Sequence, residues 1–292
     1  MKGRAIKRKY MFKQVTIVGV GLIGASLARA IQKRRLAQRI CGVFRTRTSA
    51  ARALKSLVPI QPFFEASPAL LAGSDAVILA APVGSVIQSL GMIGPHLPRG
   101  CVVMDVGSTK REILAAAASL PRGIHFVGCH PMAGSEKSGP AASKADLFEE
   151  AVCFILKESQ SGARQKAARF WRSLGAGVVL IGARDHDELT ARTSHLPHVL
   201  STALLRVVCN TRILDCRQGG GALRDMTRIA GSNPAMWRDI FCTNRDNVLQ
   251  ETQRLIRELQ TFCNILKRRD LAGLEEFWSP LSPVQKRLSN EC

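Results

Sequence analysis

A histidine in a glycine-rich segment is the residue of this chain best suited to proton transfer. The segment reads Gly-Cys-His-Pro-Met-Ala-Gly-Ser-Glu-Lys-Ser-Gly over 128–139, and His130 is its third residue. It follows a short apolar run at 124–127, whose length favours a buried strand. We therefore expect His130 to leave a sheet at the carboxyl end of a strand, where open α/β sheets bind ligands, and to accept a proton near neutral pH. A histidine that is merely hydrogen-bonded in a loop is the alternative.

Three glycines near the N-terminus predict a dinucleotide site. Gly19, Gly21 and Gly24 follow an apolar, strand-like run and precede an expected helix at 25–35 and a second strand at 39–44. This spacing permits a tight turn, a close approach of the backbone to a pyrophosphate, and close helix–strand packing. The free N–H groups of the helix N-terminus add an anion site. Further expected contacts to the cofactor are Leu22, Ile23 and Pro82.

The end of the second strand favours NADP over NAD. An acidic residue about 20 positions past the last glycine would bind a ribose 2′-hydroxyl. This chain has Phe44, Arg45, Thr46 and Arg47 there, with no carboxylate. Two guanidinium groups and a hydroxyl suit a 2′-phosphate, because arginine pairs with phosphate through a planar fork. The alternative is that these arginines are only solvated.

Apolar runs alternate with helical stretches along the first part of the chain. Strands are expected at 75–82, 151–156 and 178–181, and 101–110 is expected to be a strand that runs into a polar loop. Helices are expected from 83, at 111–119 and at 163–174. Such alternation predicts a Rossmann-type, doubly wound parallel sheet. Ser108 then lies at a carboxyl edge of the sheet, as His130 does.

Helical periodicity replaces the strand pattern from Arg184 onward. Ser194 and His198 stand four residues apart, on one helix face, and Pro197 is expected to kink that helix. Asn233 and Pro234 read as the N-cap and first position of another helix. An apolar stripe follows, at Val248, Thr252, Leu255, Leu259, Phe262 and Leu266. The stripe is either core or a dimer seam, because periodicity does not distinguish the two.

Length and composition are those of a two-domain globular protein. The 292 residues suggest two domains, and with the change of pattern near 184 they predict a basic tail at 1–13, a dinucleotide-binding domain at 14–183 and an all-helical domain at 184–292. The nine dispersed cysteines, without a Cys-x-x-Cys pair, predict reduced thiols, no metal site and a cytoplasmic location. No secretory signal or membrane span is expected. The net charge of +20 could attract nucleic acid, but aromatic residues are only 5% and no nucleic-acid motif is present.

Five motifs together resemble the prephenate dehydrogenase family, in the family's order from about Lys13 to about Leu266. They are the glycine turn at 19–24, Asp-Val-Gly-Ser-Thr-Lys at 105–110, His-Pro-Met-Ala-Gly-Ser-Glu-Lys-Ser-Gly at 130–139, Ser-His-Leu-Pro-His at 194–198, and the blocks at 219–230 and 233–237. The resemblance implies oxidative decarboxylation of prephenate, or of its amino counterpart arogenate, with transfer of a hydride to a nicotinamide. It also implies a homodimer formed through the helical domain.

The resemblance also assigns roles to individual residues. His130 matches the family's proton acceptor, Ser108 the serine that orients it, and Arg228 the arginine that pairs with a substrate carboxylate. Other matches near the substrate are Ser135, Ser194, His198 and Trp237, and an ionic network or gate would comprise Glu136, Arg224 and Asp225. Taken singly, Arg224 and Arg228 could be a solvated helix face, Trp237 a core residue and Ser194 a hydroxyl bonded to its own helix.

Two other functions remain open at this point. The same fold could act on a different substrate, as in β-hydroxyacid dehydrogenases or pyrroline-carboxylate reductases, although those families lack the His-Pro-Met-Ala-Gly block. The second alternative is a protein that has this fold but binds nucleic acid instead of catalysing a reaction. The chain ends soon after the helical region, so we expect no appended amino-acid-sensing domain.

Overall fold

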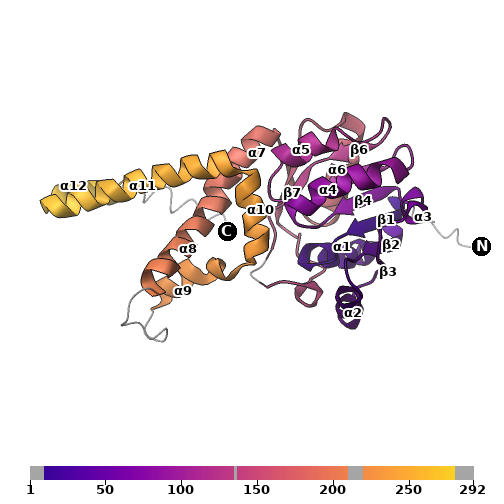
Figure 1. Cartoon of the computed structure of the whole chain (residues 1–292), viewed down its shortest axis with the longest axis horizontal. Helices are drawn as coiled ribbons and strands as arrows, with labels where there is room; N and C mark the ends of the chain where they lie inside the picture. The colour runs from indigo at the N-terminus through magenta and orange to yellow at the C-terminus, as the bar shows by residue number, and fades with distance from the viewer. Residues whose placement is uncertain (1–9, 135–136, 210–219, 280–292) are drawn as a thin grey trace, which may run out of the picture. The chain divides into compact units, whose positions relative to one another are not determined.

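The computed structural model describes residues 10–134, 137–209 and 220–279 (Figure 1). The chain divides into two compact units, Met1–Arg245 and Asp246–Cys292, which are described separately below. The domain boundary predicted between residues 183 and 184 does not coincide with the boundary between these two units. It stays a prediction.

A six-stranded parallel sheet organises the first unit. Its strands are β1 (Phe12–Val18), β2 (Ala37–Val43), β3 (Gln61–Phe63), β4 (Ala76–Leu79), β5 (Val102–Asp105) and β6 (His125–Val127). They lie in the order β3-β2-β1-β4-β5-β6, and every neighbouring pair is parallel. The strand order reverses between β1 and β4, which is where doubly wound sheets bind dinucleotides at their carboxyl ends. The predicted Rossmann-type architecture is confirmed.

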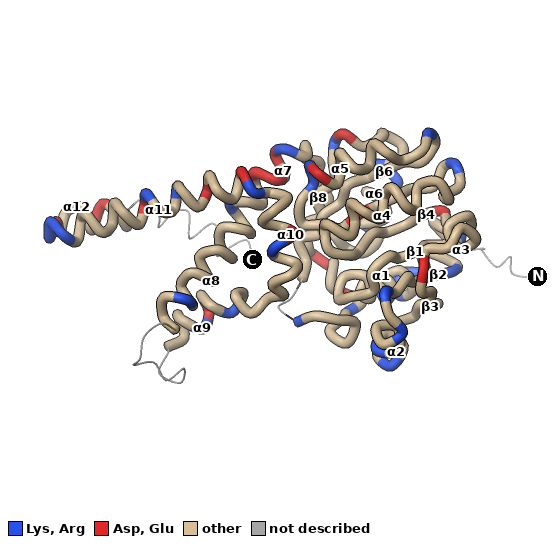
Figure 2. The backbone as a smooth tube through the Cα atoms, in the orientation of Figure 1, with Lys and Arg blue, Asp and Glu red and all other residues tan. Residues whose placement is uncertain are grey.

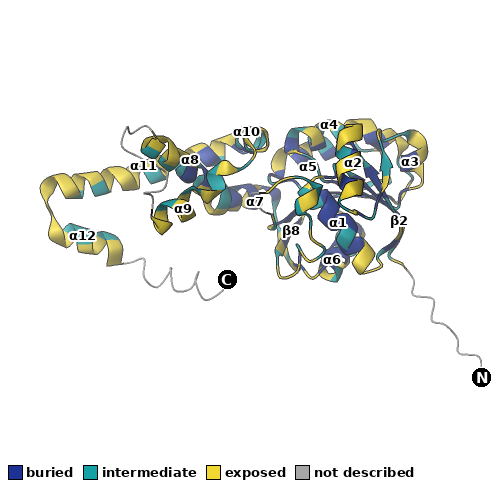
Figure 3. Cartoon of the chain, turned by 90° about the horizontal axis from the view of Figure 1, so that it is seen from below, coloured by how far each residue is buried: buried dark blue, intermediate teal, exposed yellow. Residues whose placement is uncertain are grey.

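Helices cover both faces of this sheet. They are α1 (Leu22–Lys33), α2 (Arg47–Lys55), α3 (Pro68–Ala72), α4 (Val83–Ile93) and α5 (Arg111–Ala117). One apolar cluster contains Leu27 and Ile31 of α1, and a second contains Leu90 of α4 and Ile113 of α5. Figure 3 shows that the strands and the inner sides of these helices are buried. The core therefore has two layers, one on each face of the sheet.

His130 lies in a second sheet that the sequence did not predict. This sheet comprises β7 (Cys129–Pro131), β8 (Val152–Leu156) and β9 (Gly177–Ile181), with helix α6 (Ser161–Ser173) between β8 and β9. His130 follows the carboxyl end of β6, as expected, but it pairs with Phe154 in the antiparallel β7–β8 ladder, a pairing that the sequence did not predict. Only Gly128 separates β6 from β7, and a Cβ there would lie 2.6 Å from Leu156 Cδ1. β7 is an edge strand, which tolerates a proline because an edge leaves N–H groups unpaired.

Helices complete the first unit. They are α7 (Ala183–Thr190), α8 (Leu196–Cys209), α9 (Gly221–Thr227) and α10 (Pro234–Thr243). A π-helical turn at Ala191–His195 joins α7 to α8, directly before Pro197, whose ring nitrogen has no proton to donate. Pro197 is expected to kink its helix, and the departure from α-helical geometry that the structure shows there is this π turn. The Asn233 side chain accepts a 2.9 Å hydrogen bond from Ala235 N, which confirms it as the N-cap of α10.

Two helices are described in the second unit. Helix α11 spans Arg245–Arg268, beginning at the last residue of the first unit, and α12 spans Leu271–Trp278. Phe262 of α11 packs against Phe277 and Trp278 of α12, with ring centroids 5.4 and 5.8 Å away. Leu259 and Leu266 of the predicted stripe are about half exposed. None of the helices described is long and apolar enough to cross a membrane.

Candidate active site

A chain of hydrogen bonds fixes the protonation of His130. Nδ1 of His130 lies 2.8 Å from Nε2 of His186, and Nδ1 of His186 lies 2.8 Å from Oδ1 of Asp187. A carboxylate only accepts, so His186 donates from Nδ1 and its Nε2 carries a lone pair when the ring is neutral. His130 must then donate from Nδ1, which leaves its own Nε2 as a base. The three residues form an acid–imidazole–imidazole relay with the basic atom at one end.

Burial keeps both imidazoles neutral. His186 is fully buried and His130 is 8% exposed. Desolvation lowers the pKa of His130 well below its ordinary value, and the proximity of His186 and Lys110 lowers it further. Desolvation also lowers the pKa of His186, although the hydrogen bond that His186 donates to Asp187 opposes that effect. A neutral His130 is the form that can accept a proton.

Asp187 connects α7 to the N-terminus of α5. Its Oδ1 accepts a 2.7 Å hydrogen bond from Lys110 N, and its Oδ2 accepts a 3.0 Å bond from Arg111 N. Both N–H groups belong to the start of α5, where unpaired backbone donors and the helix dipole favour a carboxylate. The same carboxylate therefore caps a helix of the Rossmann sheet and positions His186.

A buried ion pair positions the backbone beside His130. Lys110 Nζ pairs with Asp105 at the end of β5 and also donates a 2.7 Å hydrogen bond to the carbonyl oxygen of Cys129. Asp105 Oδ1 accepts a 3.2 Å bond from Cys129 N, and Oδ2 accepts a 2.8 Å bond from Gly107 N. Asp105 and Lys110 thus fix both polar groups of the residue that precedes His130.

Four aromatic side chains, from the π turn, α8 and α10, lie together. The ring of His198 stacks on Trp237 of α10 with centroids 3.6 Å apart and planes 6° apart, and Phe241 lies 5.3 Å from Trp237. His195 meets the edge of the same indole at 6.0 Å. Among the described residues, no partner satisfies the buried Nδ1 of His198, Nε1 of Trp237 or Nε2 of His195. Buried polar atoms without partners in a folded protein are candidates for ligand contacts.

The glycine turn has the shape that a pyrophosphate requires. Gly19 has a φ of +92°, and a Cβ there would lie 2.7 Å from Ala80 O. A Cβ on Gly24 would lie 2.1 Å from Gly19 O, so the helix can pack this closely only with glycine. Around Gly21, in contrast, no atom lies within 4 Å of a built Cβ. That open space lies at the N-terminus of α1, where Leu22 and Ile23 begin the helix, and it fits the phosphates of a dinucleotide.

The residues after β2 are exposed and basic. Arg45, Thr46 and Arg47 are all exposed, and Phe44 is buried. The Thr46 hydroxyl accepts a 3.1 Å hydrogen bond from Ser49 N as the N-cap of α2, whose first turn has no acidic residue. The guanidinium of Arg47 lies 5.5 Å from the ring centroid of Phe64. Figure 2 shows that Lys and Arg continue along α2.

The remaining predicted site residues lie in several elements. Ser108 is half-buried in the loop between β5 and α5, Pro82 is the N-cap of α4, and Ser194 is half-buried in the π turn. Arg224 and Asp225 are exposed on α9, and Arg228 begins a 3₁₀ turn; both segments contact α8. Ser135 and Glu136 lie outside the described residues.

Sequence reasoning missed His186, Asp187, His195 and Asn244, which all belong to the buried network. None of them falls in a glycine-rich loop at a predicted strand end. The available signal was two adjacent ionisable residues, His186 and Asp187, in an otherwise amphipathic helix, and that pattern is common on solvated surfaces.

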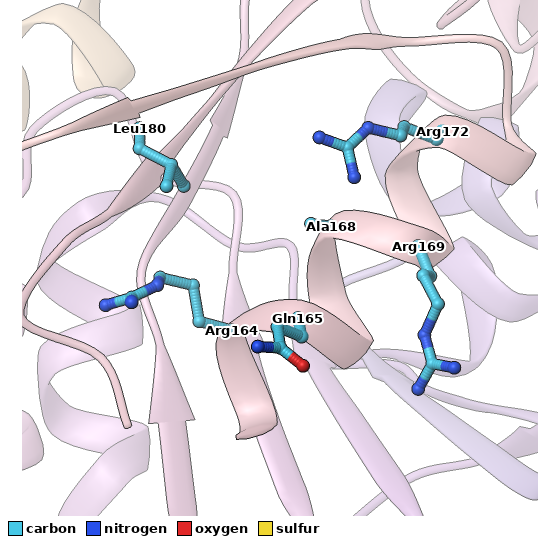
Figure 4. A pocket seen from close by; sticks show the side chains of 6 residues that line it. All are labelled: Arg164, Gln165, Ala168, Arg169, Arg172 and Leu180. Carbon is cyan, nitrogen blue, oxygen red and sulfur yellow. The ribbon is translucent and has the colours of Figure 1, made fainter. Parts of the chain in front are cut away.

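A separate hollow of about 380 Å³ lies on α6. Arg164, Arg169 and Arg172 of α6 and Leu180 of β9 border it, with Gln165 and Ala168 (Figure 4). No histidine, cysteine or carboxylate is among these residues, so the hollow offers cations but no acid–base pair.

Family comparisons agree with this geometry. The family model described as prephenate dehydrogenase, nucleotide-binding domain, matches residues 27–180, and the model described as prephenate dehydrogenase, dimerization domain, matches residues 182–279. The chain belongs to the prephenate dehydrogenase family. This dehydrogenase is 35% identical over 272 residues to the prephenate dehydrogenase of Bacillus subtilis (strain 168), an alignment covering 90% of this chain and 73% of the relative.

Solved structures extend the comparison. Prephenate dehydrogenase from A. aeolicus, in complex with hydroxyphenyl propionate and NAD+, has a TM-score of 0.85 and 29% identity, covering 95% of this chain and 98% of that one. Arogenate dehydrogenase from Synechocystis has a TM-score of 0.76 and 25% identity, covering 94% and 99%. The predictions of an NAD(P)-dependent oxidoreductase and of the prephenate/arogenate dehydrogenase family are therefore confirmed.

Proposed function

We propose that this enzyme catalyses the oxidative decarboxylation of prephenate to 4-hydroxyphenylpyruvate, with His130 as the proton acceptor and NADP as the preferred cofactor. The observation that carries the proposal is the relay from Asp187 through His186 to His130. It leaves a neutral imidazole with a basic Nε2 in a buried position.

The chemistry requires one base and a defined order of bond changes. Nε2 of His130 takes the proton of the 4-hydroxyl group, and the C4–O bond becomes a carbonyl as the hydride leaves carbon 4. The bond between carbon 1 and its carboxylate breaks to release carbon dioxide, and its electron pair makes the ring aromatic as a phenolate. The imidazolium of His130 then returns its proton to the oxygen, which gives the phenol and restores the neutral base. When NAD(P) is bound, its nicotinamide accepts the hydride. Asp187, acting through His186, stabilises the imidazolium that forms on His130, as a carboxylate does in other acid–base relays.

Several other residues complete this proposal. Ser108 orients His130 and the substrate, and Arg228 pairs with a substrate carboxylate. Ser135, Ser194, His198 and Trp237 contact the substrate, and Glu136, Arg224 and Asp225 form an ionic gate. The buried, unpartnered nitrogens of His198 and Trp237 support their place in this set.

The preference for NADP rests on charge at the end of β2. Arg45 and Arg47 are exposed there, and no carboxylate is present to repel a 2′-phosphate. The N-terminus of α2 adds backbone donors without an acidic residue in its first turn. Because the Thr46 hydroxyl already caps the helix, we assign the main attraction to the arginines.

Arogenate is the alternative substrate. It differs from prephenate only in carrying an ammonium group in place of the side-chain ketone, and the Synechocystis arogenate dehydrogenase resembles this chain over most of its length. We also propose that the enzyme is a homodimer, because residues 182–279 match a dimerization domain.

The test is a steady-state assay with both substrates and both cofactors, on wild type and on His130→Asn. We expect turnover of prephenate with NADP, and a loss of about 10²- to 10⁴-fold in kcat for His130→Asn, the usual contribution of general acid–base catalysis. Cofactor affinity, measured by fluorescence titration, is expected to stay unchanged in the variant. Turnover of neither substrate by the wild type would refute the proposed function, and wild-type kcat in the variant would refute the role of His130.

A further inference from the structure

His195 has a defined tautomer because of Asn244. Nδ2 of Asn244 lies 2.8 Å from the carbonyl oxygen of Asp187 and 3.1 Å from Nδ1 of His195. A backbone carbonyl only accepts, so the Asn244 atom that faces it must be the NH₂ group. The same NH₂ group faces Nδ1 of His195, which must therefore accept.

It follows that the neutral ring carries its proton on Nε2. His195 is 1% exposed, and burial lowers its pKa from 6.5 to about 4, so the ring is uncharged near neutral pH. Nε2–H is then a buried donor, and no acceptor for it exists among the described residues. Such a donor in a folded protein is costly to leave unsatisfied.

The surroundings of His195 are those of the candidate active site. The ring meets Trp237 edge-on, and Nε1–H of Trp237 is a second buried donor without a partner in the described structure. His195 lies near enough to His130 that a positive charge on its ring would lower the pKa of His130, and His195 itself lies in the π turn, a local distortion that often occurs at functional sites. Two buried donors without partners therefore lie on neighbouring rings, and a ligand with lone pairs would satisfy them.

We propose that Nε2–H of His195 donates a hydrogen bond to a carbonyl or carboxylate oxygen of the bound substrate, and that Asn244 holds His195 in the tautomer that can donate. His195 is then a neutral binding donor, distinct from the base His130, and Asn244 is a positioning residue. This inference rests on the proposed function, because that function supplies a ligand rich in such oxygens.

Two variants distinguish a role of His195 as a hydrogen-bond donor from a role of its ring in packing. His195→Gln keeps an N–H donor near the position of Nε2, whereas His195→Leu removes it at similar volume. Leu205→Ala, on helix α8, which directly follows the π turn that contains His195, is the matched control, because Leu205 is 37% exposed. The probes are 4-hydroxyphenylpropionate, which has a carboxylate but no ketone, and 4-hydroxyphenylpyruvate, which has both. Each is titrated into full-length enzyme saturated with NADP.

We expect His195→Leu to raise the Kd of 4-hydroxyphenylpyruvate and the KM of the substrate about 10- to 100-fold, as for a buried hydrogen bond whose partner is removed. His195→Gln should remain within a few-fold of wild type, and the affinity for NADP should not change in any variant. If His195→Leu raises the Kd of both probes equally, the acceptor is the carboxylate. If it raises only the Kd of 4-hydroxyphenylpyruvate, the acceptor is the ketone. Nitrogen-15 NMR should show a protonated Nε2 on His195 in the wild type and a mixture of tautomers in Asn244→Leu.

Three outcomes would overturn the inference: wild-type probe affinity in a folded His195→Leu enzyme, equal losses in the Gln and Leu variants, or a protonated Nδ1 in the wild type. Failure of the wild-type holoenzyme to bind either probe would overturn it as well. Failure of the proposed function has a different signature, because it appears as absent turnover of prephenate and arogenate while the probe titrations still report on His195.

Discussion

Replacing His186 with phenylalanine should remove the hydrogen bond to His130 Nδ1 while the new ring fills the space of the imidazole. The two rings have similar shapes, and His186 already meets the ring of Phe154 edge-on at 5.6 Å. Phenylalanine removes both imidazole nitrogens, so the Nδ1–H of His130 loses the acceptor that lies 2.8 Å away. His130 can then place its proton on Nε2, in which case it is no longer a base.

The magnitude follows from the burial of that donor. His130 and His186 are both buried, so an Nδ1–H without a partner costs about 1–3 kcal/mol. The productive tautomer is destabilised by this amount relative to the unproductive one, which corresponds to about a 10- to 100-fold loss of kcat. Cofactor affinity should not change, because the glycine turn at Gly19–Gly24 involves neither ring.

The assay is the rate of NADPH formation with saturating substrate, beside His186→Gln and the control Phe154→Leu. The Gln carbonyl can accept from His130 Nδ1, so His186→Gln should recover most of the lost kcat, whereas Phe154→Leu should retain wild-type kcat. A His186→Phe enzyme that is folded and has wild-type kcat would refute the relay. An equal loss in the Gln and Phe variants would show that shape rather than hydrogen bonding is responsible.

Four further outcomes are expected. Arg228→Ala should raise KM by an amount equivalent to about 2–4 kcal/mol for a lost charge pair, so an unchanged KM with both substrates would exclude its role. Arg45→Asp should reverse a preference for NADP in kcat/KM, which a wild-type preference for NAD would contradict. Lys110→Met should lower the free energy of unfolding by about 3–5 kcal/mol in urea titrations, because buried Asp105 loses its partner. Since the pKa of His195 falls from 6.5 unfolded to about 4 folded, stability should decrease by about 1 kcal/mol per pH unit as pH falls through that window, and His195→Leu should flatten this slope.

The sequence alone determined the parts of this protein that depend on local pattern. The spacing of Gly19, Gly21 and Gly24 after an apolar run specified the strand, turn and helix. Few other residues fit a φ of +92° at Gly19, and a Cβ on Gly24 would lie only 2.1 Å from Gly19 O. Alternating strand and helix periods gave the parallel sheet, and Asn233 with Pro234 marked the start of α10. Each of these features has a signal that can be read from residues close together along the chain.

The tertiary structure alone decided how His130 is held. Its partner His186 is 56 residues away in the sequence, and Asp187 meets Lys110 across 77 residues. Helical periodicity does not reveal such pairs, since a histidine and an aspartate in an amphipathic helix look the same whether solvated or buried. The three-residue strand β7 is too short to carry a periodic signal, so its pairing with β8 was also hidden. Folding brings α7 against the N-terminus of α5, and only that packing turns His186, Asp187 and Asn244 into a network that assigns a proton to each ring.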